Sequence, residues 1–220
     1  MSHPLPVLSL LETRVLGVLV EKQHTVPDSY PLTLNALVAG ANQKTARDPV
    51  IEATEAEVQA AIDHLKSLSM VMESSGGRVM RYAQKVGKVI GVPPHAVALL
   101  SVLFLRGPQT AGELRIHSER LHRFGDILSV EAFLDELAQR NEGALVHELA
   151  KQAGARETRW VHLLSGEPAT PEPAAEGSLS ETVTVSELAA MKANIGELQR
   201  EVAELKESVA KLTRELGVAS

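Results

Sequence analysis

A run of apolar residues near the C-terminus repeats every seven positions, and no other pattern restricts the fold of this chain so strongly. Its members follow one another at alternating steps of three and four: Leu188, Met191, Ile195, Leu198, Val202, Leu205, Val209, Leu212 and Leu216. This spacing is typical of a coiled-coil helix with a narrow apolar seam. A lone helix of this kind has no core of its own, so the pattern predicts a homodimer formed through this segment.

The residue types along the seam favour one arrangement of the pair. β-Branched residues alternate with leucines, a combination typical of parallel dimers. In a parallel pair Glu187 would face Lys192 and Glu201 would face Lys206, so that opposite charges meet. The alternative is that the helix folds back on the body of its own chain.

Composition limits the classes of protein to which the chain can belong. It has 220 residues and 44% hydrophobic content, enough for one or two modest cores. The absence of cysteine excludes disulfides, thiolate zinc sites and a cysteine nucleophile. No apolar stretch is long enough to cross a membrane, and Glu12 and Arg14 interrupt the apolar N-terminal segment, which argues against a signal peptide. We therefore expect a cytoplasmic protein with no membrane partner.

The net charge of -6 is unevenly distributed along the chain. Residues 167–220 hold five Lys and Arg against ten Asp and Glu, so the segment with the heptads carries most of the acidity. The remaining body is close to neutral. Charge therefore neither excludes nor indicates nucleic acid as a partner of the body.

Capping and turn residues divide the first part of the chain into short elements. Ser9 and Thr54 each begin a capping box, and Gly76-Gly77 is typical of a hairpin turn. The predicted elements are helices over residues 9–22, 33–42 and 54–68 and strands over residues 70–73 and 78–82.

The same order of elements is predicted again after Pro93-Pro94. Thr110 is expected to cap the second helix of this set and Ser129 the third. The predicted elements are helices over residues 95–105, from 110 and from 129, and strands over residues 145–149 and 159–164. Three helices followed by a hairpin is the order of a winged helix, a helix-turn-helix variant.

The predicted fold class is mainly α with small β-hairpins (α+β), with two winged-helix domains in tandem plus a C-terminal coiled-coil helix. The predicted boundaries are residues 1–88 for the first domain, 89–165 for the second, 166–183 for a linker rich in Pro, Ala and Glu, and 184–217 for the coiled-coil helix.

Several motifs of the body resemble those of one family. They are Glu21-Lys22, Tyr30-Pro-Leu-Thr-Leu-Asn-Ala-Leu37, Asn42-Gln-Lys-Thr-Ala-Arg-Asp-Pro-Val50, Ser118-Glu-Arg-Leu-His-Arg-Phe124 and Ala155-Arg-Glu-Thr-Arg-Trp-Val-His-Leu-Leu164. Together they resemble the uncharacterised bacterial YceH-like family over residues 8–165. The resemblance implies a pair of winged-helix domains, and it carries no biochemical role with it.

Winged helices commonly bind DNA through their third helix, but here that helix is acidic. The first set places Glu55, Glu57 and Asp63 on it, and the second set adds Glu131 and Asp135. Because phosphates rim the grooves of DNA, acidic faces fit them poorly. We expect weak, salt-dependent binding through loops and wings instead, by a non-catalytic nucleic-acid-associated or regulatory factor.

The candidate contacts to nucleic acid or to a partner lie in these loops and wings: Asn42, Gln43, Lys44, Arg47, Arg78, Arg81, Arg115, Arg120, Arg123, Arg156 and Arg159. Residues 42–47 could bind phosphate or could satisfy the start of the third helix. Ordinary solvated surface charge is the competing interpretation of the scattered Lys and Arg.

Two other functions remain open at this stage. The winged helices could dock a protein partner instead of DNA, with the C-terminal helix presenting two copies of the docking face. An enzyme is not expected, and no cofactor or metal is predicted, because His117 and His122 lack the fixed spacing of a zinc signature. Tyr30 and Trp160 are expected to belong to the core.

Overall fold

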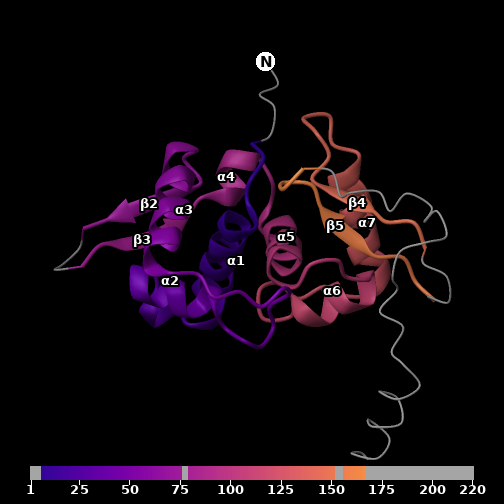
Figure 1. Ribbon diagram of the computed structural model, residues 1–220. Coiled ribbons are helices and arrows are strands. Elements are labelled where there is room, and N and C mark those ends of the chain that lie inside the picture. The colour runs from indigo at the N-terminus through magenta and orange to yellow at the C-terminus, as the bar shows by residue number, and fades with distance from the viewer. Residues whose placement is uncertain (1–5, 76–78, 152–155, 167–220) are drawn as a thin grey trace, which may run out of the picture. The chain divides into compact units, whose positions relative to one another are not determined.

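The computed structural model describes residues 6–75, 79–151 and 156–166. Within these ranges the protein is an α+β fold of helices and small antiparallel sheets (Figure 1). Arg78, the linker from residue 167 onward and the predicted coiled-coil helix lie outside the described residues. None of the helices in the described ranges is both long and apolar enough to span a membrane.

Local capping signals correctly predict the helices of the first half of the body. Ser9 caps α1, Thr33 caps α2 and Thr54 caps α3, each through a side-chain oxygen that accepts a backbone N–H. The elements are α1 Leu10–Thr25, η1 Pro27–Ser29, β1 Leu32–Thr33, α2 Leu34–Ala41, α3 Glu55–Ser67, β2 Val71–Ser74, β3 Arg81–Gln84 and α4 Val86–Ile90. Neither β1 nor α4 was expected from the sequence, because each is too short to show a periodic pattern.

The second half follows the predicted order, with one correction. Its elements are α5 Pro94–Arg106, α6 Ala111–His117, α7 Ile127–Ala138, β4 Val146–Glu148 and β5 Trp160–His162. Thr110 caps α6 as predicted. The prediction that Ser129 caps α7 is wrong: Asp126 is the cap, and its carboxylate accepts the Ser129 N–H at 2.8 Å. Asp126 stands three residues earlier and is an equally good capping residue, so the helix begins at Ile127.

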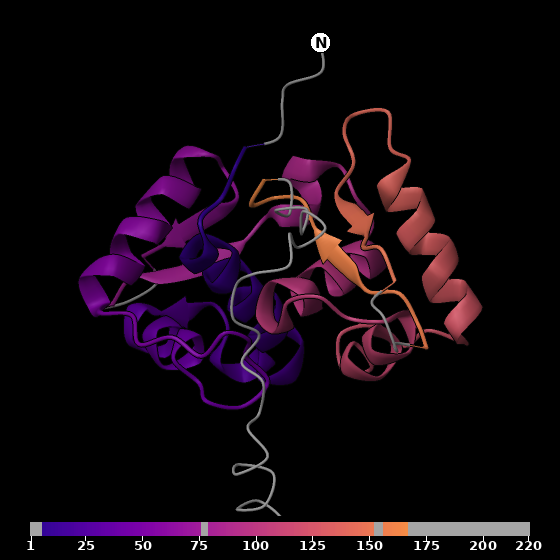
Figure 2. The ribbon, with the colours of Figure 1, turned by 45° about the vertical axis from the view of Figure 1, so that its right-hand side comes forward.

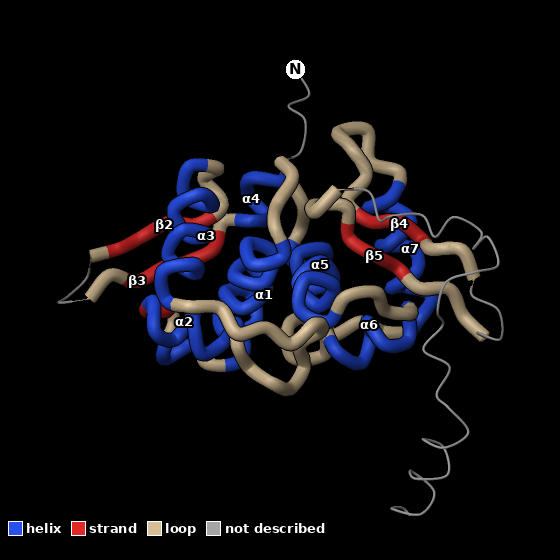
Figure 3. The backbone as a smooth tube through the Cα atoms, in the orientation of Figure 1, coloured by secondary structure: helices blue, strands red, loops and turns tan. Residues whose placement is uncertain are grey.

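The two halves repeat one strand arrangement. In the first half the sheet has the order β1-β3-β2, and Leu32 pairs with Tyr82 and Val71 with Gln84. In the second half β4 pairs with β5, and Gln109 forms a further bridge to Trp160 on the other edge of β5. Figure 3 shows the two hairpins as separate red pairs flanking the helices. Gln109 precedes α6 as β1 precedes α2, so both halves place a short edge segment before their second helix.

One continuous core joins the two halves. Figures 1 and 2 show α1 beside α5, and the core extends from Leu8 to Leu164. The two helices approach closely at Gly17, where an added Cβ would lie 2.8 Å from Cγ of Leu105. The predicted domain boundary at residue 88 lies inside α4, which connects the halves. Because α1 and α5 cover each other, each half buries its first helix against the other half.

Candidate nucleic-acid interface

The side chains in the polar segment from Asn42 to Arg47 form hydrogen bonds mainly with other groups of the protein. The Asn42 amide donates to the Ala53 carbonyl at 2.8 Å and accepts the Ala53 N–H at 2.7 Å. It thus satisfies the backbone immediately before α3, which is one of the two roles that the sequence left open. Gln43 bonds to Thr45 within the same loop, and Lys44 is exposed.

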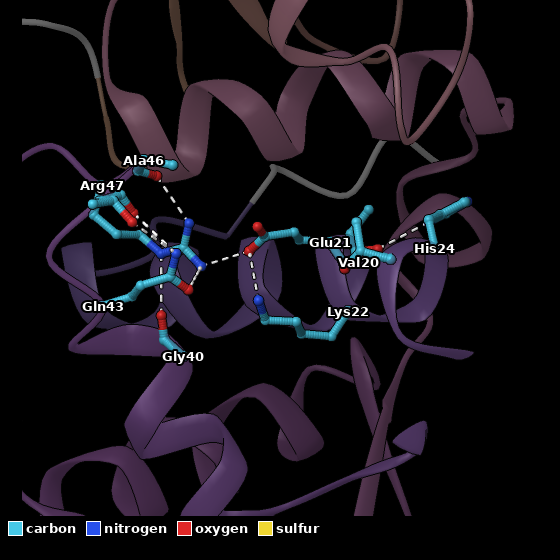
Figure 4. A network of polar contacts seen from close by, with 10 residues as sticks. Val20, Glu21, Lys22, His24, Gly40, Gln43, Ala46 and Arg47 are labelled. Carbon is cyan, nitrogen blue, oxygen red and sulfur yellow. Dashed lines mark hydrogen bonds and ion pairs between the residues drawn. The ribbon is translucent and has the colours of Figure 1, made fainter. Parts of the chain in front are cut away.

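The guanidinium of Arg47 has no exposed surface. It donates to the Gly40 carbonyl at 3.1 Å, to the Ala46 carbonyl at 2.8 Å and to the Glu21 carboxylate, as Figure 4 shows. Glu21 also lies 3.7 Å from the Lys22 ammonium. All of these partners belong to the protein, so we leave Arg47 out of the proposed contact surface.

A second buried arginine supports the same loop and was not assigned a role from the sequence. Arg14 lies in the second turn of α1, fully buried, and donates to the Ala41 carbonyl at 3.2 Å and the Pro49 carbonyl at 2.7 Å. It therefore connects the end of α2 and the loop that follows to the core. The available signal was an arginine directly before the unbroken apolar run of residues 15–20.

Two of the predicted wing contacts anchor their strands instead. Arg81, at the start of β3, donates to the Pro31 carbonyl at 2.7 Å, just before β1. Arg159, just before β5, donates to the Pro108 carbonyl at 2.8 Å and forms two bonds to the Glu113 carboxylate, at 3.1 and 3.2 Å. Both arginines thus hold the hairpin of their half to the segment that precedes the second helix.

Replacing Arg159 by glutamine should lower the free energy of unfolding by about 1 kcal/mol, because the bidentate ion pair with Glu113 is lost at a partly exposed site. Urea unfolding would measure this loss. The matched control is Arg156→Gln, an exposed arginine of the same segment, which should change stability by less than about 0.5 kcal/mol. Equal losses in the two variants would show that Arg159 does not anchor the strand.

The remaining candidate arginines gather on α6 and the turn that follows it. Arg115, Arg120 and Arg123 are exposed, and we call them the α6 arginine surface. Arg123 lies 3.4 Å from Glu119, but both side chains are mostly exposed, at 83% and 62%, so that pair is weak. These three guanidinium groups are the candidate contacts most accessible to a partner, together with Lys44 and Arg156.

Residues 8–155 match the family described as "Protein of unknown function, DUF480". The chain belongs to this family. The prediction of membership in an uncharacterised bacterial family is therefore confirmed.

Relatives of high identity are similar over nearly the whole chain. A "UPF0502 protein" of Dechloromonas aromatica is 56% identical over 215 residues, 98% of this chain and 100% of the relative. Those of Paraburkholderia phytofirmans and Leptothrix cholodnii are 56% and 55% identical, each over 96% of this chain and over 90% and 96% of their own. The alignment thus extends through most of the C-terminal segment with the heptads.

The third helix of each half, α3 or α7, carries a charge opposite to that of the α6 arginine surface. Glu131, Asp135 and Glu136 are exposed on α7, and Glu55, Glu57 and Asp63 are exposed on α3. These helices therefore present the acidic faces that the sequence predicted.

Trp160 and Tyr30 pack into or against the core, as the sequence predicted. Trp160 is 5% exposed, and Tyr30 is partly buried against the core, where its hydroxyl accepts the Gln84 N–H at 2.8 Å. His122 packs edge-on against Phe124, with ring centres 4.7 Å apart. His117 bonds to Gln109 through Nδ1, at 2.8 Å.

Proposed function

We propose that the protein is a non-catalytic, dimeric, nucleic-acid-associated factor that binds phosphates of duplex DNA through the α6 arginine surface. The observation that carries this proposal is the grouping of Arg115, Arg120 and Arg123 on one helix and its following turn, exposed to solvent. Exposed arginines bind phosphate well because the planar guanidinium can donate two parallel hydrogen bonds.

The repeated strand arrangement supports the proposal that each half is a winged helix. Both halves run helix, edge segment, helix, helix and hairpin, and in both the edge segment pairs with the last strand. On this proposal α5, α6 and α7 are the three helices of the second winged helix, and the β4–β5 hairpin is its wing.

The position of the arginines in such a motif predicts phosphate contact without base recognition. In a helix-turn-helix the helix before the recognition helix crosses the DNA backbone, and α6 occupies that position. The recognition helix would be α7, whose exposed Glu131 and Asp135 would meet the phosphate-lined groove unfavourably. Binding should therefore be weak, of low sequence specificity and strongly dependent on salt.

We propose that residues 184–217 form a parallel coiled coil and so bring two bodies together. The support is the unbroken heptad and the extension of the similarity to the relatives through most of this segment. Two weak phosphate-binding surfaces on one dimer would bind a duplex more tightly than one surface alone.

Charge reversal of the α6 arginine surface tests the DNA-binding proposal. A generic duplex, followed by fluorescence anisotropy, should bind the full chain at low salt, with a slope of log affinity against log salt of about -3 per body. The triple variant Arg115→Glu, Arg120→Glu and Arg123→Glu should bind at least tenfold more weakly, because each lost arginine removes about one phosphate contact.

The control reverses three exposed lysines that are not candidate contacts and changes the net charge by the same amount: Lys85→Glu, Lys88→Glu and Lys151→Glu. It should retain most of the affinity. Equal losses in both variants would mean that no particular surface binds DNA. The seam variant Leu198→Glu with Leu205→Glu should sediment as a monomer and bind the duplex more weakly.

Docking of a protein partner is the second candidate function, and one observation favours it. Ile116 and Leu128 are 65% and 73% exposed near the α6 arginine surface, and exposed apolar residues beside charged ones are typical of protein-binding surfaces. If the wild-type chain does not retain the duplex in low salt at tens of micromolar protein, DNA binding is wrong and protein docking becomes the better hypothesis.

A further inference from the structure

A hollow of about 510 Å³ lies between the C-terminal parts of α1 and α5, the loop around Arg47, and α6 with its following turn. We call it the central hollow. Its volume is within the range of pockets that hold small organic molecules, about 300–1,000 Å³. Three sequence motifs that resemble the family's meet there, through Glu21-Lys22, Arg47 and Arg120.

Basic residues outnumber acidic ones around the central hollow. Lys22, Arg47, Arg106 and Arg120 line it, and the acidic residues among its lining are Glu21 and Glu119. Both carboxylates already have partners. Glu21 binds Arg47 and lies near Lys22, while Glu119 forms a weak, exposed pair with Arg123, which does not line the hollow. The described residues therefore leave a surplus of positive charge in this space.

Arg106 carries the clearest part of this surplus. No carboxylate of the described ranges lies within salt-bridge distance of its guanidinium, which is partly buried at the end of α5. Burial and, after it, the nearby charge of Arg47 lower the pKa of Arg106, and the charge of Glu21 offsets only part of this effect. Since a guanidinium stays protonated in proteins, this buried charge would be stabilised by an anion.

A chain of hydrogen bonds positions Arg106 for such an anion. The Gln109 amide donates to the Pro108 carbonyl at 3.0 Å, which turns its oxygen toward Nδ1 of His117 at 2.8 Å. Nδ1 must then carry the proton, so Nε2 of His117 accepts from Nη1 of Arg106 at 3.4 Å. Within the described part of the chain this is the only side-chain hydrogen bond of Arg106, and it leaves Nε and Nη2 for a ligand.

We infer that the central hollow binds a small organic phosphate. The planar guanidinium of Arg106 matches two phosphate oxygens, with Arg120 and Lys22 as further cationic contacts. Val26, Val102 and Leu105 also line the hollow and would contact the less polar part of the molecule. Arg120 belongs both to the central hollow and to the α6 arginine surface, but Arg106 is not part of that surface. Replacing Arg106 therefore tests the hollow without removing a proposed DNA contact.

Isothermal titration of the full chain with AMP, and with adenosine as its uncharged counterpart, tests the inference. AMP should bind with a dissociation constant below millimolar, and adenosine should bind at least tenfold more weakly. Arg106→Gln should weaken AMP binding at least tenfold, whereas Arg156→Gln, which replaces an exposed arginine that does not line the hollow, should leave it unchanged. Because the protein bonds of Arg106 are few, its variant should keep the wild-type unfolding midpoint without ligand.

A backbone phosphate of nucleic acid could also bind these cationic residues, and a competition experiment between a duplex and AMP distinguishes the two ligands. If a duplex displaces AMP from the wild type, and AMP binding is lost in Arg106→Gln, the hollow is a small-molecule site that nucleic acid can also reach. Duplex binding that requires Arg106 without any AMP binding overturns the inference. The inference is also overturned if millimolar AMP gives no heat and no rise in the unfolding midpoint of the wild type. Equal losses of AMP binding in Arg106→Gln and Arg156→Gln would overturn it too, whatever the duplex assay shows.

Discussion

Replacing Arg14 by alanine should lower the free energy of unfolding by about 3 kcal/mol or more. The change would leave the carbonyls of Ala41 and Pro49 without their donor and would open a cavity beside α1, where the buried side chain now lies. An unsatisfied buried carbonyl costs about 1–3 kcal/mol, and the cavity adds to this. Part of the loss is offset, because burial and, after it, the like charge of Arg47 lower the pKa of Arg14, and both unfavourable effects disappear when the guanidinium is removed.

Denaturant unfolding of the full chain measures this effect, and the protein offers a matched control. Arg81 also donates to two carbonyls, those of Ser29 and Pro31, but at the surface. Arg81→Ala should therefore cost no more than about 1 kcal/mol. If Arg14→Ala costs no more than Arg81→Ala, Arg14 does not support the loop as we describe.

Acid should destabilise the protein through His162. Burial lowers the pKa of His162 from its ordinary value of 6.5 to about 4, and its Nδ1 is buried without a partner among the described residues. Between these two pH values the unfolded chain binds a proton that the folded chain does not, so stability falls as pH falls through this window. The full loss at this position is about 3 kcal/mol, at 1.4 kcal/mol for each pH unit of pKa difference.

The test compares unfolding free energies of wild type and His162→Gln across the range from neutral pH to about pH 4. The variant should lose much less stability than the wild type over this range, although His95 and His117, whose pKa values are also lowered by burial, leave some acid sensitivity. His147→Gln, an exposed position on the neighbouring strand, is the control and should follow the wild type. Parallel curves for His162→Gln and wild type would contradict the assignment.

The structure links His162 to the packing of the second hairpin. Its ring lies edge-on to Phe104 of α5, with centres 4.9 Å apart. Protonation would place a charge between β5 and α5, so acid unfolding should begin where this hairpin contacts the core. Hydrogen exchange of the backbone amides would test this, because the amides of β4 and β5 should lose protection before the rest of the core as the pH falls.

Most helix starts could be predicted from the sequence because caps are local. Ser9, Thr33, Thr54 and Thr110 each satisfy a backbone N–H within three residues, so no distant contact is needed to place the helix start. The start of α7 was misplaced because Asp126 and Ser129 are both capping residues and bond to each other. The edge segments β1 and Gln109 were missed because they are defined only by pairing with strands far along the chain.

The candidate contacts show where prediction from charge fails. Arg47, Arg81 and Arg159 were grouped with Arg115 and Arg123 because all are basic residues in loops or wings. The first three bond to carbonyls or carboxylates that folding brings to them from up to 52 residues away. The sequence does not show which arginine will meet such a partner, and so it could not separate structural arginines from accessible ones.

The sequence by itself determined the order of helices and hairpins, the acidic faces of α3 and α7, and the heptad that predicts a dimer, because each depends on spacing within one element. Only the tertiary structure decided that α1 packs on α5 and that Arg14 and Arg47 are buried. It also decided that Arg106 borders the central hollow and forms no salt bridge with a carboxylate of the described residues. These features arise where segments distant in sequence meet. Burial and charge pairing depend on the contacts between such segments and cannot be read from one segment alone.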